Sequence, residues 1–432
     1  MSNQYKPVEW SYNTNIYEVN LRQYTQEGSF QAFEQELPRL RDMGIEVLWF
    51  MPVTPISREK RLGTLGSYYA CSDYTSTNPE YGSLDGFKQL VQTAHALGFK
   101  VLIDWVANHT GWDHTWTREH PDYYKKNWEG NFYDPNGWED VIDLNYDNPA
   151  VHLAMIEAMR FWITECDIDG FRCDMAMLVP LDFWRTVRAE LDKMKELFWL
   201  AECEEISFHE VFDATYSWNL LHKMEAFWRG EINIGVLDEV LHHYSTAFPP
   251  NAFHLLFTTN HDENSHSGSE YERMGQAAEA FAVLCCTWNG IPLIYSGQEL
   301  PNKKRLKFFD KDQIEWTGTN ALHNFYKKLL SLRKTNKALQ AGERSKTIRL
   351  KTAADQFVFA FLRECEGDEV LILLNLSGEE RSFFEITDEQ LSGIFVNILS
   401  ENESDFTQKK HFALRPWEYL VYVKERSLVP AV

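Results

Sequence analysis

Four stretches decide the fold of this chain: VLIDWVANH (101–109), GFRCDMA (170–176), FWLAECE (198–204) and LLFTTNHDEN (255–264). Each is an apolar run that ends abruptly in a carboxylate, a histidine or both. Buried parallel strands are almost continuously apolar, and in a barrel of such strands the active site lies at the carboxyl-terminal rim. The stretches therefore predict strands that carry polar groups to one rim, with Asp174, Glu202 and Asp262 as candidate active-site acids.

The spacing of these stretches fits a larger pattern, because short β-rich runs alternate with helical patterns from residue 15 to about 340. Eight strands are predicted, at 15–21, 47–53, 101–107, 170–176, 198–203, 214–220, 253–260 and 291–297. Amphipathic stretches separate them, including a helix over 30–44 that ends at Gly44 and another over 84–98 that ends at Gly98. The pattern predicts an α/β fold, a (β/α)8 TIM barrel.

Two segments depart from the alternation of strands and helices. Residues 110–148 are rich in Trp, Tyr, Asp, Asn, Pro and Gly without a clear period, and a loop of this length is usually functional. From residue 341 the sequence changes to short strands between polar turns, which is typical of an antiparallel domain. We predict a barrel made of 1–109 and 149–340, a short insertion after strand 3 at 110–148, and a C-terminal antiparallel β domain at 341–432.

Charge and composition exclude several classes of partner. The 432 residues carry 64 acidic against 42 basic side chains, a net charge of −22, which argues against nucleic acid and anionic lipid. No apolar run is long enough to span a bilayer, and the start MSNQYKPVEW lacks the pattern of a signal peptide. The seven cysteines form neither a disulfide framework nor a CxxC zinc pattern. We expect a cytoplasmic protein with a neutral ligand and no nucleic-acid or membrane partner.

The residue types at the ends of the predicted strands suggest acid and nucleophile chemistry. Arg172 and Asp174 lie two apart in a strand and point the same way, so the arginine should keep the aspartate ionised at low pH. An ionised, positioned carboxylate suits a nucleophile. Glu202 ends an apolar run, where burial should raise its pKa, as a general acid requires. Asp262 follows His261 and supplies a third acid with a hydrogen-bonding neighbour.

Each of these features has a structural alternative when taken singly. An Arg-x-Asp pair is usually a structural ion pair, and a glutamate at a strand end is usually solvated or caps the next helix. Glu204 and Glu205 follow Glu202 closely, so the choice of Glu202 rests on its place at the strand end. Three acids at the ends of separate strands of one barrel are much less often accidental than any one of them.

The motifs resemble those of the α-amylase family of retaining glycoside hydrolases and transglycosidases. DWVANH (104–109), GFRCD (170–174), LAE (200–202) and TNHDEN (259–264) match the motifs of strands three, four, five and seven in order. The resemblance also extends to GSYYACSDY (66–74) and YSGQE (295–299). Four ordered motifs are specific for the family and poorly specific for the substrate.

The resemblance implies a role for each residue that matches a motif. Asp174 would be the nucleophile, Glu202 the general acid and then base, and Asp262 the acid that holds and distorts the sugar. Four further residues would bind substrate or orient an acid: Tyr69, His109, Arg172 and His261. The tyrosine would stack on the sugar ring, the histidines would hydrogen-bond its hydroxyls, and the arginine would orient the nucleophile. Asp104 and Asn108 would support the site. From sequence alone, Tyr68 and Tyr69 could exchange roles.

The expected function is α-amylase-like hydrolysis, with retention, of α-1,4-glucosidic bonds in starch, glycogen or malto-oligosaccharides by a monomer. An α-glucosidase, a maltogenic enzyme or a glucanotransferase is an alternative, because chain-end specificity and the fate of the covalent intermediate depend on loops. A non-catalytic sugar-binding relative is a remote alternative, since such relatives typically lose one or more of the three acids.

The chain also departs from the pattern of the best-known α-amylases. Met177 and Leu178 stand where a Lys-His pair is typical, which weakens the case for calcium. Asn108 matches an asparagine that often binds calcium, and acids of the insertion offer oxygen donors, but no Asp-x-Asn-x-Asp-Gly loop is present. We therefore predict no metal, with calcium as the alternative.

Two further interpretations concern the insertion and the C-terminal domain. Seven aromatic residues of the insertion could be sugar-stacking platforms or a small loop core: Trp112, Trp116, Tyr123, Tyr124, Trp128, Tyr133 and Trp138. The C-terminal domain has no obvious aromatic platform, which favours a packing role over glucan binding.

Overall fold

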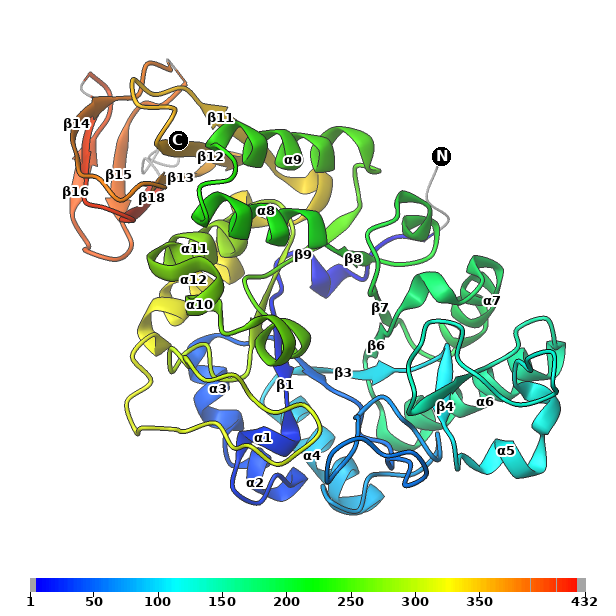
Figure 1. Cartoon of the computed structure of the whole chain (residues 1–432). Coiled ribbons are helices and arrows are strands. Elements are labelled where there is room, and N and C mark those ends of the chain that lie inside the picture. The colour runs from blue at the N-terminus through cyan, green and yellow to red at the C-terminus, as the bar shows by residue number, and fades with distance from the viewer. Residues whose placement is uncertain (1–4, 389, 409, 426–432) are drawn as a thin grey trace.

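Eight parallel strands form a closed barrel in the order β1-β10-β9-β8-β7-β6-β3-β2 (Figure 1). The strands are β1 (Ile16–Val19), β2 (Val47–Phe50), β3 (Lys100–Trp105), β6 (Gly170–Cys173), β7 (Phe198–Ala201), β8 (Ala214–Tyr216), β9 (Phe253–Leu256) and β10 (Ile291–Tyr295). The structure is a computed structural model and describes residues 5–388, 390–408 and 410–425. The predicted (β/α)8 barrel is confirmed.

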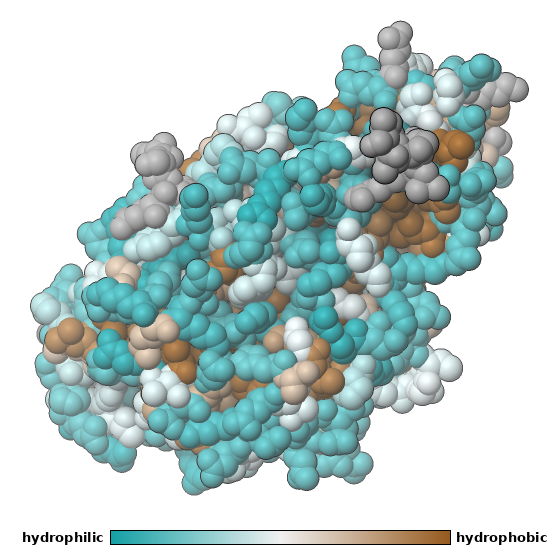
Figure 2. Space-filling view, turned by 180° about the vertical axis from the view of Figure 1, so that it is seen from behind, coloured by the Kyte–Doolittle hydropathy of each residue, from teal (hydrophilic) through white to brown (hydrophobic). Residues whose placement is uncertain are grey.

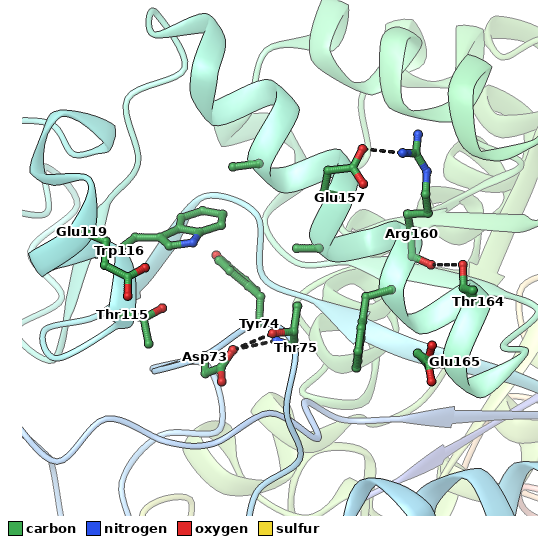
Figure 3. A pocket seen from close by; sticks show the side chains of 13 residues that line it. Asp73, Tyr74, Thr75, Thr115, Trp116, Glu119, Glu157, Arg160, Thr164 and Glu165 are labelled. Carbon is green, nitrogen blue, oxygen red and sulfur yellow. Dashed lines mark hydrogen bonds and ion pairs between the residues drawn. The ribbon is translucent and has the colours of Figure 1, made fainter.

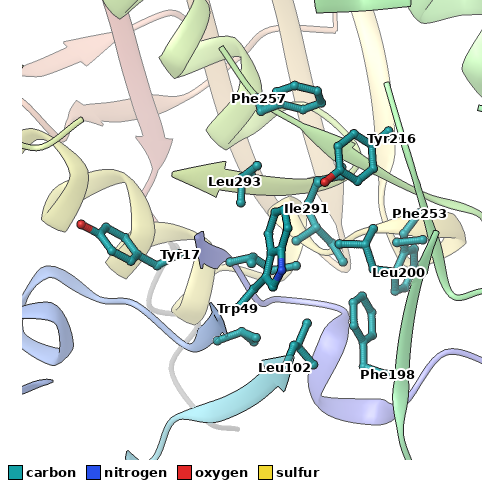
Figure 4. Packing of buried hydrophobic residues seen from close by; sticks show 14 of the residues in the cluster. Tyr17, Trp49, Leu102, Phe198, Leu200, Tyr216, Phe253, Phe257, Ile291 and Leu293 are labelled. Carbon is teal, nitrogen blue, oxygen red and sulfur yellow. The ribbon is translucent and has the colours of Figure 1, made fainter. Parts of the chain in front are cut away.

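The barrel interior is a packed core of large side chains. Trp49, Leu102 and Leu200 are fully buried there and point among residues of the opposite strands (Figure 4). Burial of each such side chain stabilises the fold by about 1.5–3 kcal/mol. Strands β6 and β7 approach so closely at Gly170 that a Cβ atom there would lie 2.0 Å from the Phe198 carbonyl oxygen. This packing sets the register that brings polar side chains to the rim.

Helices cover the outside of the barrel, and one predicted helix is split. The helices are α1 (Leu21–Tyr24), α2 (Phe30–Glu34), α3 (Leu37–Met43), α4 (Leu84–Ala96), α6 (Pro149–Cys166), α7 (Leu181–Leu191), α8 (Trp218–Trp228), α9 (Ile234–Ala247), α10 (Glu270–Met274), α11 (Ala278–Thr287) and α12 (His323–Thr335). The helix predicted over 30–44 is broken between α2 and α3, because Pro38 lacks an N–H and starts a new first turn. Gly44 ends α3 in the left-handed conformation, as expected.

The sixth barrel strand is shorter than predicted. Strand β8 ends at Tyr216, and Trp218 already begins α8, so the second half of 214–220 is helical rather than extended. The Glu204 carboxylate explains this boundary, since its Oε2 accepts the backbone N–H of Asn219 at 2.7 Å. An acidic group at the first turn satisfies a free N–H and interacts favourably with the helix dipole.

The insertion after β3 holds a small antiparallel pair, β4 (His109–Gly111) and β5 (Val141–Asp143), and a short helix, α5 (Thr115–Glu119). Several of its aromatic rings pack on one another, as a loop core would. Trp116 lies 5.4 Å from Tyr123 and 5.1 Å from Tyr74 between ring centroids. Trp128, by contrast, is 92% exposed. The rings of this insertion therefore serve different purposes.

The C-terminal domain consists of antiparallel sheets, as predicted. Its strands are β11 (Lys346–Leu350), β12 (Val358–Cys365), β13 (Asp368–Asn375), β14 (Arg381–Glu385), β15 (Ile394–Asn397), β16 (Glu403–Asp405), β17 (His411–Leu414) and β18 (Tyr419–Lys424). Strands β14, β16 and β17 are short runs with polar or charged residues. Residues 1–4 of the predicted barrel segment and 426–432 of the predicted C-terminal domain lie outside the described residues.

Alternating side chains of β12 link the C-terminal domain to the barrel. Phe359 and Phe361 pack into the main core, where Trp288 of the barrel lies 4.8 Å from Phe361 between ring centroids. Val358 and Leu362 point the other way, into a separate core within the domain. One face of the sheet thus covers the barrel, as a packing domain would.

The face shown in Figure 2 is largely hydrophilic, with apolar residues gathered in small patches. Within residues 5–388, 390–408 and 410–425, the helices are too short or too polar to cross a membrane.

Candidate active site

One cavity of about 460 Å³ at the carboxyl-terminal rim brings together most of the predicted site residues. Five of them line it: Tyr69, His109, Asp174, Glu202 and Asp262. Asp174 follows β6 directly and Glu202 follows β7 directly, while Asp262 lies in the segment after β9. The strand ends therefore deliver acids from three strands to the same hollow, although these acids are far apart in the sequence.

Arg172 lies beneath this cavity and contacts three carboxyl groups. Its Nη1 is 2.9 Å from Asp104 Oδ1 and 3.0 Å from Asp174 Oδ1, and its Nη2 is 3.0 Å from Glu202 Oε1. The register of the sheet causes this arrangement, because Asp104 of β3 is paired with Arg172 of β6. The arginine is fully buried. One guanidinium thus contacts the candidate nucleophile and the candidate acid at the same time, and it also pairs with Asp104.

Asp174 and Glu202 each have a pKa above that of a free carboxylic acid. Burial raises the pKa of Glu202 to about 8, against the opposing effect of Arg172, and the charges of Asp174 and Asp262 add to the rise. Burial also raises the pKa of Asp174 to about 6, again opposed by Arg172. The rise at Glu202 matches the sequence-based expectation. The expectation that Arg172 keeps Asp174 ionised at low pH is wrong, since desolvation outweighs the ion pair.

The backbone after Asp174 helps to hold Glu202. Met175 has φ 40°, a left-handed conformation that is uncommon for a residue other than glycine. In this conformation its N–H donates to Glu202 Oε2 at 2.8 Å. The neighbouring Glu204 is engaged elsewhere, because its carboxylate accepts from Asn219 and from the Tyr244 hydroxyl. The geometry thus separates Glu202 from the acid that follows it.

Tyr69, and not Tyr68, faces the cavity. The Tyr69 hydroxyl donates to Asp104 Oδ2 at 3.1 Å and lies 2.7 Å from His261 Nε2. Tyr68 lies apart and donates to Asn20 Oδ1 at 3.1 Å. His261 itself is buried behind the cavity and contacts Asp262 at 3.3 Å from Nε2 to Oδ2.

The insertion contributes the opposite wall of the cavity. His109 is buried, and burial lowers its pKa to about 4, so the ring is neutral at pH 7. Trp138 lies across it, with 5.4 Å between ring centroids, and lines the cavity. Among the insertion aromatics, Trp138 is therefore the ring placed to meet a ligand.

Sequence reasoning missed several residues that line the cavity, three of them with rings, and one residue that lies behind it. His266, Phe308 and Phe309 line the cavity from the segments after β9 and β10. Phe308 stacks on Tyr69, with 6.3 Å between centroids. Glu18 of β1 lies against His261. Phe308 and Phe309 lie in an irregular loop, where no periodic pattern could have identified them. Glu18 could have been found, because it is a charged residue within the apolar predicted strand NIYEVNL (15–21).

Calcium does not fit the place suggested by Asn108. Asn108 Nδ2 donates to Asp143 Oδ1 at 3.1 Å, and Lys125 Nζ lies 2.9 Å from Asp143 Oδ2. Both oxygens of this carboxylate therefore face hydrogen-bond donors, whereas calcium needs a shell of oxygen ligands. Across the part of the chain that the structure describes, no group of three His, Cys, Asp or Glu residues could hold a metal ion.

A second cavity, of about 710 Å³, lies between α5 and α6 (Figure 3). None of the candidate site residues lines it. Two of its acids are engaged in local contacts: Asp73 accepts from Thr75, and Glu157 pairs with Arg160. The rim cavity, with its unusual carboxyl groups, is therefore the better candidate for chemistry.

Known proteins resemble this chain over most of its length. Residues 11–317 match the family described as "Alpha amylase, catalytic domain". The α-amylase MalA of Haloarcula japonica is 28% identical over 397 residues, which cover 87% of this chain but only 57% of MalA.

Two solved structures have the same fold. The noncanonic maltogenic α-amylase AmyB of Thermotoga neapolitana superposes with a TM-score of 0.87 at 28% identity, covering 96% of this chain and 99% of AmyB. An α-amylase from Lactobacillus plantarum gives a TM-score of 0.86 at 27% identity, with the same coverage. The resemblance first indicated by the four motifs is confirmed: the chain belongs to the α-amylase family of glycoside hydrolases.

Proposed function

We propose that the protein hydrolyses α-1,4-glucosidic bonds in starch, glycogen or malto-oligosaccharides with retention of configuration. One observation carries the proposal: Asp174 and Glu202 share one guanidinium beside a single cavity, while their pKa values differ. Carboxyl groups with separated pKa values are the mark of a nucleophile and acid pair. Two carboxyl groups that contact one guanidinium also lie close together. This suits a retaining enzyme, in which the two catalytic carboxyl groups are about 5–5.5 Å apart.

In the first step, the Asp174 carboxylate attacks the anomeric carbon while Glu202 donates its proton to the glycosidic oxygen. The bond to the leaving sugar breaks, and a covalent glycosyl ester forms on Asp174. In the second step, Glu202, now a carboxylate, takes a proton from water as the water attacks the same carbon, the ester bond breaks, and the sugar leaves Asp174 as a free carboxylate. Asp262 lies beside this carbon and holds the distorted ring, and Arg172 keeps both reacting carboxyl groups in place.

The remaining cavity residues bind the sugar. Tyr69 offers a ring face and His109 a neutral imidazole. His261 lies behind them and reaches a hydroxyl of the sugar with its Nε2. Asp104 and Asn108 act from outside the cavity: Asp104 supports Arg172 and Tyr69, and Asn108 supports Asp143 of the insertion.

A maltogenic enzyme is the second candidate. AmyB, with 28% identity over nearly the whole chain, carries that description. The cavity is also walled on two sides, by Trp138 of the insertion and by Phe308 and Phe309, which would favour short glucans or chain ends.

Product analysis tests both candidates. The enzyme is incubated with soluble starch, maltoheptaose and β-cyclodextrin, and the products are separated by chromatography with Asp174→Asn as blank. Mixed short oligosaccharides from starch support the amylase, whereas maltose alone supports the maltogenic enzyme. Products longer than maltoheptaose indicate transfer, and no product from any substrate contradicts the proposal.

We also propose that the enzyme acts in the cytoplasm, as a monomer on a neutral glucan. Its seven cysteines are free and six of them are buried, which suits a reducing compartment. The net charge of −22 disfavours nucleic acid and anionic membranes. Cell fractionation and the hydrodynamic size of the native protein test this placement; an extracellular or dimeric enzyme would contradict it.

A further inference from the structure

Glu18 is a buried acid that the proposed reaction does not use. It lies in the middle of β1, is fully buried, and its Oε1 is 2.5 Å from His261 Nδ1. Its other oxygen, Oε2, has no hydrogen-bond partner among the described residues. A buried carboxylate is costly unless it is paired with a cation. His261 is the side chain placed to pair with it.

The hydrogen-bond partners of the two ring nitrogens of His261 favour its protonated form. The Tyr69 hydroxyl has one proton to donate, and it lies 3.1 Å from Asp104 Oδ2, which as a carboxylate oxygen only accepts. With the proton given to Asp104, the hydroxyl accepts from His261 Nε2, 2.7 Å away, and Asp262 Oδ2, 3.3 Å from Nε2, is a second acceptor. On the other side of the ring, the Glu18 carboxylate also accepts from Nδ1. Both ring nitrogens thus face acceptors, and only the imidazolium can donate to both at once.

We propose that Glu18 is a positioning residue that holds His261 as an imidazolium, with one N–H fixed on Glu18 and the other directed toward Tyr69 and the sugar. This inference rests on the proposed function, in which His261 contacts a sugar hydroxyl. A charged donor makes a shorter and stronger hydrogen bond than a neutral one. The hydroxyl that meets His261 would thus be held more tightly than the one that meets neutral His109.

The charges around His261 support this state. Burial works against the cation, but Asp262 and Glu18 outweigh it and raise the pKa of His261 to about 9. Arg172 opposes the rise from the side of β6. The other ionisable group in contact with the ring is Tyr69, which donates its proton to Asp104. Among the residues that the structure describes, Glu18 is the acid in direct contact with Nδ1.

The test is a histidine titration by NMR in the full-length protein. His261 is assigned by the signal that disappears in His261→Gln. In the wild type, His261 should stay cationic through pH 8. In Glu18→Gln, which keeps the size and the acceptor oxygen, its pKa should fall by roughly one to three pH units. Glu18→Asp keeps the charge and should restore at least part of the difference.

Glu270→Gln is the matched control. Glu270 is also buried at the rim, but its Oε2 accepts from Thr258 and Gln298 rather than from His261. Its substitution should leave the His261 signal unchanged. A wild-type His261 that is neutral at pH 7.5, or a pKa that Glu18→Gln does not lower, would overturn the proposal. The wild-type titration decides the matter even if Glu18→Gln does not fold.

Kinetics add a second readout. Because the neutral ring loses one donor, Glu18→Gln should lose activity on maltoheptaose at a lower pH than the wild type, and KM should rise more than kcat falls. The NMR result does not require activity on glucans. A failed glucan assay with a cationic His261 would therefore reject the proposed substrate and leave the role of Glu18 standing.

Discussion

Two buried clusters of charged side chains in this molecule differ in how many acids surround each cation. At the barrel rim, one guanidinium, Arg172, meets three carboxyl groups, those of Asp104, Asp174 and Glu202. In the insertion, one ammonium, Lys125, meets one carboxylate, that of Asp143. Each further acid beside the same cation raises the pKa of its neighbours, so the rim centre keeps a proton on Glu202 up to about pH 8, whereas the pKa of Asp143 is raised only to about 6. Imbalance thus marks the site of proton transfer, and balance marks a structural support.

Removing the nucleophile tests the functional side of this comparison most severely. Asp174→Asn keeps the shape but cannot form the glycosyl ester, so kcat on maltoheptaose should fall roughly 10⁴-fold or more. Its thermal stability should not fall, because a buried acid is replaced by a neutral amide. Initial rates and a melting curve check both expectations; turnover near the wild-type rate in a clean preparation would reject Asp174 as nucleophile.

Removing the shared cation should harm the fold itself. Arg172→Met leaves three buried carboxyl groups without their guanidinium, and breaking a buried pair costs about 3–5 kcal/mol of unfolding free energy. Arg172→Lys is the milder control, because it keeps the positive charge. It should not restore full stability, since one ammonium cannot replace the two terminal nitrogens that reach separate acids. Denaturant unfolding measures the difference. If Arg172→Met unfolded at the wild-type midpoint, the arginine would not hold the centre together.

Removing the acid separates proton donation from binding. Glu202→Gln should lower the rate on glucan roughly 10²–10⁴-fold. The loss should be much smaller on a glucoside with a good leaving group, which needs little protonation. Rates on maltoheptaose and on an activated aryl α-glucoside make the comparison, and an equal loss on both substrates would exclude Glu202 as the acid.

The sequence was most informative where strands end in polar residues. The barrel and the placement of Asp174, Glu202 and Asp262 around one cavity followed from four apolar runs. The break before Pro38 was missed because the apolar period of the predicted helix continues across the proline. The early end of β8 was missed because the cap from Glu204 depends on a tertiary contact. The pKa of Asp174 was misjudged for a related reason: the adjacent arginine is visible in sequence, but the degree of burial is not.

Removing the ammonium tests the structural side of the comparison. Lys125→Met leaves the buried Asp143 without its cation and should cost roughly 1–3 kcal/mol of stability while activity is retained. Lys126→Met, the same change at an exposed neighbour, should stay within about 0.5 kcal/mol of the wild type. Added calcium should leave the wild-type melting curve unchanged, since Asn108 and Lys125 already donate to the two carboxylate oxygens of Asp143. Stabilisation by calcium would contradict this account.

The smallest expected effect, a pH dependence, separates the two centres directly. Asp174 must be ionised to attack, so kcat/KM should fall as the pH drops through about 6. Glu202 must be protonated to donate, so activity should also fall as the pH rises through about 8. Asp143 has a pKa of about 6 as well, raised by burial, but it takes no part in proton transfer. Lys125→Met should therefore leave both limbs of the profile in place, whereas Glu202→Gln should remove the alkaline limb. A profile whose acid limb moved in Lys125→Met would show that the insertion pair is coupled to catalysis and that charge balance does not distinguish the two centres.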